Sequence, residues 1–255
     1  MLRLCLARGD LVCFGTLPVQ YRDQEIVAYA RRLTELLGDQ EEAALGYGTV
    51  YHPWLLTQEL TGEPRLLPSA GAMIGQFAAA TLRRGAWIAP INQDLTGVVG
   101  LQTRPYGKRA GKLTDANLNL VEQEAMGFRA MTAFSLSSTP ALRPLTIRRL
   151  FSLLRRYILQ QGEIMAFAPN IPAFRALAQQ RFYRMLFDLH MQGAFAGNTP
   201  EESFLVRADE ELNPPESVEQ GRFVMELRIA PAQPLSFITV RLVQTLGEQL
   251  KVTGV

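Results

Sequence analysis

The segment at residues 222–229 constrains the fold of this chain more than any other. Its side chains have the period of a β-strand with one buried face. The apolar half is Phe223, Met225, Leu227 and Ile229, and the other half is Arg222, Val224, Glu226 and Arg228. Such a strand needs partners in a sheet. A second run with this alternation, at residues 235–244, lies close to the end of the sequence, and we expect its outer edge to be uncovered.

Composition places the chain among ordinary globular proteins. Its 255 residues are 47% hydrophobic and 20% charged, which is enough for the core of one large domain or two modest ones. The net charge of +2 gives no strong basic field, so the sequence predicts no nucleic-acid partner. Because no apolar run reaches membrane-spanning length, the sequence also predicts no membrane span.

Two cysteines, Cys5 and Cys13, lie in apolar surroundings near the N-terminus. We interpret them as small buried side chains without a disulfide, a pattern typical of cytosolic proteins. The apolar run that begins the sequence is too short for a secretory signal. We therefore expect a cytoplasmic protein.

The first half of the sequence alternates strand-like and helix-like segments, the pattern of an α/β domain. Strands are expected at residues 11–17, 47–51 and 127–134, and helices at residues 26–37, from residue 69 and at residues 114–124. Ser69 is the expected N-cap of its helix. Small residues such as Gly71 and Gly75 would let that helix lie close against a sheet.

Residues 135–144 mark the boundary to a second domain of different character. Two helices follow, with apolar stripes over residues 147–158 and 174–189, and then three short strands, which is typical of an α+β domain. The first helix carries four arginines on its other faces: Arg148, Arg149, Arg155 and Arg156. The sequence therefore predicts an α/β domain at residues 1–138 and a smaller α+β domain at residues 139–255.

Patterns typical of catalysis or metal binding are poor. The two histidines, His52 and His190, have no accompanying ligands at metal-binding spacing. Ser69 lies in a Pro-Ser-Ala-Gly sequence that departs from the G-x-S-x-G elbow of hydrolases at its first glycine. We therefore predict a protein that is not an enzyme and binds no cofactor or metal. A divergent α/β hydrolase stays as a distant alternative.

An ordered succession of short motifs resembles the tail sheath proteins of contractile phages and contractile injection systems. In the first half the motifs are YHPWL at residues 51–55, LPSAGAMIG at 67–75, RGAWIAPIN at 84–92 and TGVVGL at 96–101. In the second half they are TIRRL at 146–150, FAPN at 167–170, QGAFAG at 192–197, EESFLV at 201–206, NP at 213–214, GR at 221–222 and APAQPLSFI at 230–238. The resemblance extends from about residue 8 to residue 244.

This resemblance implies a non-enzymatic structural subunit. Sheath proteins of the family have a subtilisin-like α/β domain without a working triad, followed by a smaller C-terminal domain that lies against an inner tube. They stack as six-fold rings into a helical sleeve and pair terminal strands between subunits. When a baseplate triggers it, the sleeve contracts and drives the tube into a target.

The resemblance also implies partners and a location. The partners are further copies of the chain in six-fold rings, the inner tube protein, and baseplate and cap proteins. The location is a phage tail or an injection-system particle that assembles in the cytoplasm. No cofactor is implied, because the free energy for contraction is stored in the assembled lattice.

The final alternating run is the candidate for the strand exchanged between subunits. Its apolar residues are Leu235, Phe237, Ile238, Val240, Leu242 and Val243. The alternative is that this run completes its own sheet. The four arginines at positions 148, 149, 155 and 156 are candidates for contact with the inner tube, and a solvated helix surface is the alternative.

Two departures from the family pattern bear on the role. Family members carry an N-terminal arm ahead of the part that corresponds to Arg8, and this sequence has almost nothing there. A sheath-like terminal adaptor at the baseplate or cap is therefore the alternative to a main sheath subunit. Residues 247–255 extend past the family's usual end, and they would either cover the edge strand or form a mobile tail.

Overall fold

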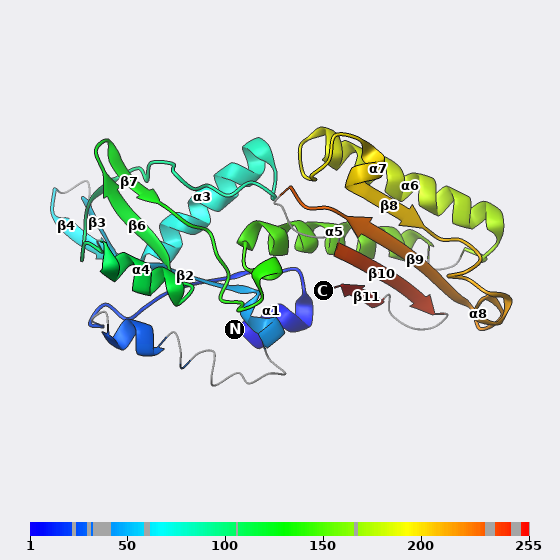
Figure 1. Cartoon of the computed structure of the whole chain (residues 1–255), viewed down its shortest axis with the longest axis horizontal. Coiled ribbons are helices and arrows are strands. Elements are labelled where there is room, and N and C mark those ends of the chain that lie inside the picture. Colours follow the sequence, from blue (N-terminus) through cyan, green and yellow to red (C-terminus); the bar gives the residue numbers. More distant parts are fainter. Residues whose placement is uncertain are drawn as a thin grey trace. The chain divides into compact units, whose positions relative to one another are not determined.

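A computed structural model describes residues 1–21, 24–29, 32, 42–58, 62–105, 107–165, 168–232, 238–245 and 251–254. The chain divides into two compact units, Met1–Ser152 and Leu153–Val255. The division lies inside one continuous helix, α5 (Leu145–Met165), whereas the sequence suggested a boundary at residues 135–144. Figure 1 labels the elements in chain order.

The first unit contains two sheets. Its main sheet has the order β1-β2-β6-β7, formed by β1 (Cys13–Thr16), β2 (Gly48–His52), β6 (Asn119–Glu124) and β7 (Gly127–Ala130). Strands β1, β2 and β6 are parallel, and β7 returns antiparallel to β6. The second sheet is antiparallel with the order β4-β3-β5, formed by β3 (Leu55–Gln58), β4 (Pro64–Leu67) and β5 (Val98–Leu101). The helices of this unit include α1 (Leu2–Arg8), α3 (Ser69–Arg84), α4 (Lys108–Asp115) and the 3₁₀-helix η1 (Pro140–Leu142).

Apolar side chains bury the main sheet on both faces, because successive residues of a strand point to opposite sides. On one face, Tyr51 of β2 belongs to a cluster with Met73 and Phe77 of α3. On the other face, Val50 of β2 belongs to a cluster with Leu113 of α4. The α/β character expected for the first half of the sequence is therefore confirmed.

One element of the first unit was predicted wrongly. Residues 114–124, expected as a helix, contain the end of α4 and the whole of β6. The first three residues of β6 are all buried, and such a run fits a buried helix as well as a strand covered on both faces. Asn119 begins β6 with no exposed surface, and its Nδ2 donates to the carbonyl oxygen of Phe134 at 2.8 Å and to the hydroxyl of Thr49 at 2.9 Å.

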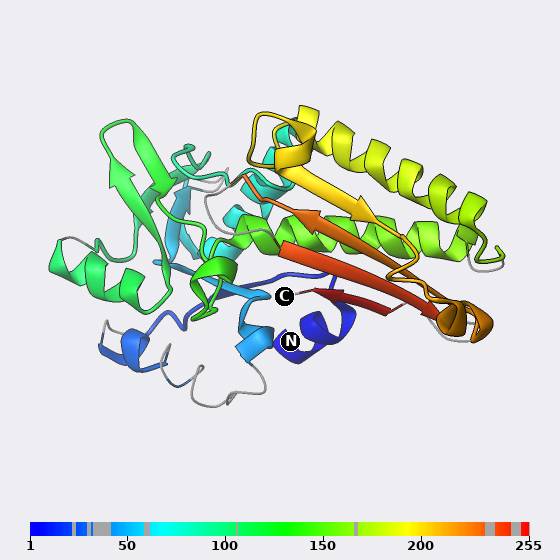
Figure 2. The ribbon, with the colours of Figure 1, turned by 45° about the vertical axis from the view of Figure 1, so that its right-hand side comes forward.

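The second unit is an antiparallel sheet with helices, as expected for an α+β domain. Its strand order is β11-β10-β9-β8, formed by β8 (Phe204–Arg207), β9 (Arg222–Ile229), β10 (Ile238–Thr245) and β11 (Lys251–Gly254). Figure 2 shows these four strands side by side. The helices are the remainder of α5, then α6 (Pro172–Met191), α7 (Pro200–Ser203) and α8 (Pro215–Glu219).

Helices α5 and α6 cover one face of this sheet. Met165 of α5 and Phe182 of α6 lie around the same small space as Phe223 and Met225 of β9 and Leu242 of β10. The apolar half of the β9 alternation therefore faces the helices, as its period predicted. Leu242 lies opposite Met225 in the register, so the two strands present their apolar residues to the same side.

Candidate functional site: assembly surfaces

The run predicted to be exchanged between subunits forms β10, an inner strand of the second unit's sheet. Strand β10 pairs with β9 along its whole length. On its other edge, its residues 240–243 pair antiparallel with β11. The expectation that this outer edge is uncovered is therefore wrong, because β11 covers half of it. Of the two alternatives for the C-terminal extension, pairing with the edge strand is confirmed for Lys251–Gly254.

The predicted exchange residues have different places in this strand. Val240 and Leu242 are buried on the side that faces the helices, at 3% and 4% exposure. Val243 is half-buried and points to the opposite side, and the backbone of Ile238 pairs with Ile229. The other two predicted residues, Leu235 and Phe237, lie outside the described residues. Among the described ones, burial against the strand's own unit explains the apolar residues at positions 240 and 242.

Strand β11 forms one edge of the sheet. It pairs with β10 along its four residues, and Val252 is half-buried. From α5, Arg155 Nη1 donates to the carbonyl oxygen of Val252 at 3.3 Å. Arg155 therefore holds the C-terminal strand of its own unit. A short strand at the edge of a sheet belongs to the less stable part of a domain.

Arg148 is buried in the first unit, at 7% exposure. Its guanidinium carbon lies 4.2 Å from the centre of the Tyr47 ring, a cation–π distance. Burial lowers the pKa of Arg148, and the interaction with Tyr47 opposes that shift. A Cβ atom on Gly46 would lie 2.9 Å from Arg148 Nη2, so any other residue there would require the guanidinium to shift. The prediction that Arg148 lies on an outward face is wrong.

Arg149 caps the C-terminal end of α3. Its Nη1 donates to the carbonyl oxygen of Ala86 at 3.2 Å, its Nη2 donates to the hydroxyl of Thr81, and its guanidinium lies 4.7 Å from the centre of the Phe77 ring. The C-terminal end of a helix carries partial negative charge, so a cation near it is stabilising. Arg149 is thus engaged within the first unit, and Arg156 is the exposed member of the four arginines.

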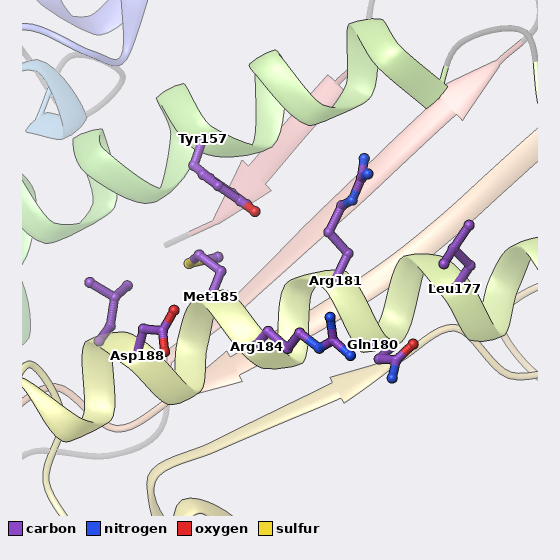
Figure 3. Close-up of a pocket in the computed structure, with 8 residues that line it drawn as sticks. Tyr157, Leu177, Gln180, Arg181, Arg184, Met185 and Asp188 are labelled. Carbon is purple, nitrogen blue, oxygen red and sulfur yellow. The ribbon is translucent and has the colours of Figure 1, made fainter.

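A groove of about 480 Å³ lies between α5 and α6 of the second unit (Figure 3). Its apolar lining comes from Tyr157, Leu177, Met185 and Leu189. In Figure 3 the Tyr157 side chain extends from α5 toward α6. The ring of Tyr157 packs edge-on against Phe182, 5.7 Å between centres, so the floor of the groove is fixed by the core beneath it.

Charged side chains form the rim of this groove. Arg181, Arg184 and Asp188 all line it from α6. Arg181 Nη1 reaches across to donate to Gln161 Oε1 of α5 at 3.1 Å. No ion pair or side-chain hydrogen bond engages Arg184 in the described part of the chain. None of the sequence motifs includes these three residues. Their spacing of three and four residues, which places them on one face of the helix, is the pattern that could have found them.

The outer face of the second unit's sheet carries a buried carboxylate between two arginines. Glu226 is 5% exposed, and it accepts hydrogen bonds from Arg228 Nε at 2.8 Å and from Arg241 Nη2 at 3.1 Å. Burial raises the pKa of Glu226, and the bonds from Arg241 and Arg228 lower it, with the net result below the ordinary value. Glu226 and Arg241 lie opposite each other on β9 and β10, so this ion pair joins the two strands.

Three short motifs that are far apart in the sequence meet at the beginning of β9. Asn213 is 2% exposed and pairs with the backbone of Val224 in both directions, donating from Nδ2 and accepting at Oδ1, at 2.8 Å each. Asn170 Nδ2 donates to the carbonyl oxygen of Arg222 at 2.7 Å. Arg175 Nη1 in turn donates to Asn170 Oδ1 at 3.2 Å. These side chains complete backbone hydrogen bonding where β8 does not reach, which is a structural role.

Ser69 and His52, the residues considered for catalysis, are buried and have structural surroundings. Ser69 has no exposed surface, and its Oγ has no hydrogen-bond partner among the described residues. The backbone N–H of Ala70 is instead capped by Thr16 Oγ1 at 3.0 Å, so the prediction of Ser69 as the N-cap is wrong. His52 is 3% exposed, with Nε2 3.4 Å from Thr103 Oγ1. A hydrolase would need a base at Ser69 Oγ, and within the described ranges nothing bonds to that oxygen.

The described residues show neither a metal site nor a helix that could span a membrane. No group of three or more His, Cys, Asp or Glu side chains in the described ranges is arranged to hold a metal ion. Among the helices of the described residues, none combines the length and the apolar character needed to cross a membrane.

Comparison with known proteins identifies the fold. No protein-family model and no curated protein sequence matches the chain. A chain of the anti-feeding prophage (AFP) baseplate in the contracted state matches with a TM-score of 0.79 and 20% identity, over 92% of this chain and 61% of that one. A chain of the contracted PVC sheath complex, an extracellular contractile injection system, matches with a TM-score of 0.72 and 21% identity, over 87% and 60%.

A crystal structure extends the match beyond the injection systems. The sheath tail protein of Desulfitobacterium hafniense matches with a TM-score of 0.63 and 14% identity, over 94% of this chain and 58% of that one. The chain has the fold of contractile sheath proteins, and the resemblance drawn from its motifs is confirmed at that level. It spans about three fifths of the length of these three structures' chains.

Proposed function

We propose that this chain is a structural subunit of a contractile sheath that surrounds an inner tube and contracts to drive it into a target. The observation that carries the proposal is the sheath-protein fold, shared over 92% of this chain with the AFP baseplate chain and 87% with the PVC sheath chain. In this proposal the first unit is the subtilisin-like sheath domain and the second unit faces the tube. Copies stack as six-fold rings in a particle assembled in the cytoplasm, and the chain is not an enzyme.

Strand exchange between copies would use β11 in place of β10. A strand given to a neighbour's sheet adds main-chain hydrogen bonds without a large side-chain interface. Strand β10 is paired on both sides and contributes Val240 and Leu242 to the core, so its departure would open the unit. Strand β11 lies at the edge, and its departure leaves β10 fully paired with β9. Exchange of β11 between copies then costs little free energy, because the same backbone pairing with β10 re-forms in the neighbouring copy.

A sheath-like terminal adaptor at the baseplate or cap is the second candidate. It is supported by the matches to chains of the AFP baseplate, which have TM-scores of 0.79 and 0.68. A main subunit would repeat along the sleeve, whereas an adaptor would be confined to one end. Partners of the adaptor would be the main sheath protein together with a baseplate or cap protein.

Negative-stain electron microscopy of the chain, alone and with its neighbouring gene products, tests the proposal. Sleeves or stacked rings support a main sheath subunit, and ordered caps at one end of a tube support the adaptor. A protein that remains monomeric under all of these conditions contradicts both.

A variant that ends at Thr245, and so lacks β11, tests the exchanged strand. We expect it to fold and to lose assembly, because β10 keeps its pairing with β9 while the exchanged segment is missing. The full-length variant Lys251→Ala, which changes one exposed side chain of β11, serves as the control. Assembly of the shortened variant at the level of the wild type would show that β11 only closes its own sheet.

A further inference from the structure

The β6–β7 hairpin of the first unit presents an apolar side chain at its tip. The tip, residues 123–126, is exposed throughout, and Met126 is 84% exposed. Glu124 lies beside it at the end of β6 and forms no ion pair with a described residue. The base of the hairpin is firm, because Val121 and Phe128 are buried in the core. Figure 1 shows the hairpin extending away from the other strands of the main sheet.

A single exposed methionine is ordinary on a protein surface. The α5–α6 groove of the second unit is complementary to this tip in polarity and in charge. The groove offers an apolar floor, with Leu177 58% exposed, and an arginine on its rim, Arg184, that no described residue pairs with. Its volume of about 480 Å³ is within the range of sites that take up a compact group.

We propose that the hairpin tip of one copy docks into the α5–α6 groove of the next copy. Met126 enters the apolar floor and Glu124 faces Arg184. Asp188 on the same rim repels a carboxylate, so the tip is accepted only in the orientation that turns Glu124 away from Asp188. This inference rests on the proposed self-assembling sheath, for which it names one of the contacts between copies.

The proposed contact is heterologous, because the tip belongs to the first unit and the groove to the second. A pair of copies therefore keeps one free groove on the copy whose tip is bound and one free tip on the copy whose groove is bound. A contact of this kind does not pair two copies and stop; it continues as a ring or a helical array. A single tip buries little surface, so one junction alone is weak and other contacts between copies must support it in a sleeve.

Charge reversal on the full chain tests the contact. Glu124→Arg and Arg184→Glu each place like charges together, and we expect each to weaken self-association, measured by sedimentation velocity, by roughly tenfold or more. The double variant restores an opposite pair and should recover most of the loss. A mixture of the two single variants should recover association as an assembly in which they alternate, because the tip of each variant and the groove of the other carry opposite charges.

Further variants separate docking from general effects. Met126→Asp should abolish association and Met126→Leu should preserve it, whereas Glu219→Arg, on the exposed end of α8, should change nothing. Unchanged thermal unfolding verifies that each variant folds. Wild-type association that both single reversals leave intact, or that the double variant fails to recover, overturns the contact, as does a wild type that never self-associates.

The outcomes distinguish this contact from the sheath proposal. Sleeves in electron micrographs that are unaffected by both reversals would overturn the contact and leave the sheath role standing. Association that the mixture of the two variants recovers, without sleeves or caps under any condition, would support the contact and remove the sheath role.

Discussion

At the scale of single residues, the four arginines of α5 show how one side-chain type takes different roles on one helix. Arg148 is buried against Tyr47, Arg149 caps the end of α3, and Arg155 binds a carbonyl of β11, while Arg156 is exposed. Successive residues of an α-helix point about 100° apart, so neighbouring arginines meet different surroundings. The same type of side chain therefore packs against an aromatic ring at position 148, binds the end of α3 at position 149 and holds β11 at position 155.

Glu226 gives a prediction about stability and pH. Its folded pKa lies below the unfolded value of about 4.3, so the carboxylate stabilises the fold at neutral pH and this contribution is lost as the pH falls below about 4. We expect Glu226→Gln to lower the free energy of unfolding by roughly 1–3 kcal/mol at pH 7. The difference from the wild type should shrink toward pH 3. Denaturant titrations at both pH values measure it.

The control for this prediction is Glu219→Gln, which changes an exposed carboxylate on α8. It should leave the stability at pH 7 within a few tenths of a kcal/mol of the wild type. A Glu226→Gln deficit that is the same at pH 7 and pH 3 would contradict the ionic role and point to packing alone.

At the scale of elements, helix α3 is held at both ends by residues from other segments. Thr16 of β1 caps its first turn, and Arg149 of α5 caps its last. Gly85 ends the helix with φ at 102°, and a Cβ there would lie 2.3 Å from the Trp87 ring, so no other residue fits. Tertiary contacts therefore help to define both ends of α3, and Gly85 provides the backbone conformation in which the helix ends.

Arg149→Ala tests the C-terminal cap of α3. The substitution removes charge-assisted hydrogen bonds and a cation–π contact, and we expect it to destabilise the first unit by about 2–3 kcal/mol. Arg149→Lys keeps the charge and loses the planar fork, so it should recover only part of the loss. Thermal unfolding followed by circular dichroism provides the measurement. Arg84→Ala, at an exposed position of the same helix end, is the matched control, and an equal effect of both would contradict the cap.

At the scale of the whole molecule, α5 belongs to both compact units. Its first two turns carry Arg148 and Arg149, which are engaged in the first unit, and its later turns carry Leu154 and Ile158, which are buried. The chain thus passes from the first unit to the second within one continuous helix. Of the four arginines proposed for the inner tube, this leaves Arg156 as the candidate.

Arg156→Glu tests contact with the inner tube. The substitution reverses an exposed charge, and if Arg156 faces the tube we expect co-sedimentation of sheath and tube protein to weaken several-fold at low salt and less at high salt. Arg84→Glu provides an equal reversal on an exposed position of the first unit. Binding that responds alike to both reversals, or to neither, would remove Arg156 from the proposal and leave its surface solvated.

Several features of the fold could be predicted from the sequence because they depend on local periodicity. The alternation at Phe223 and Met225 predicts a strand, and the stripe that includes Leu154 and Ile158 predicts an amphipathic helix; both elements are confirmed. The expectation that only one face of the strand is buried is wrong, because Val224 and Glu226 on the other face are buried as well. The order of the short motifs also carried the resemblance to sheath proteins, and the fold confirms it.

Contacts between distant segments were decided only by the tertiary structure. Periodicity could not show that β11 covers β10, that Asn213 completes the backbone pairing of Val224, or that Gly71 and Gly75 of α3 have open space beside them and no sheet. For most segments the sequence by itself determined where strands and helices with a buried face lie, because that follows from the spacing of apolar residues; residues 114–124 were the exception. Which edge is covered, which arginine is buried and which groove stays open depend on the chain's return path in space, and local sequence does not encode that path.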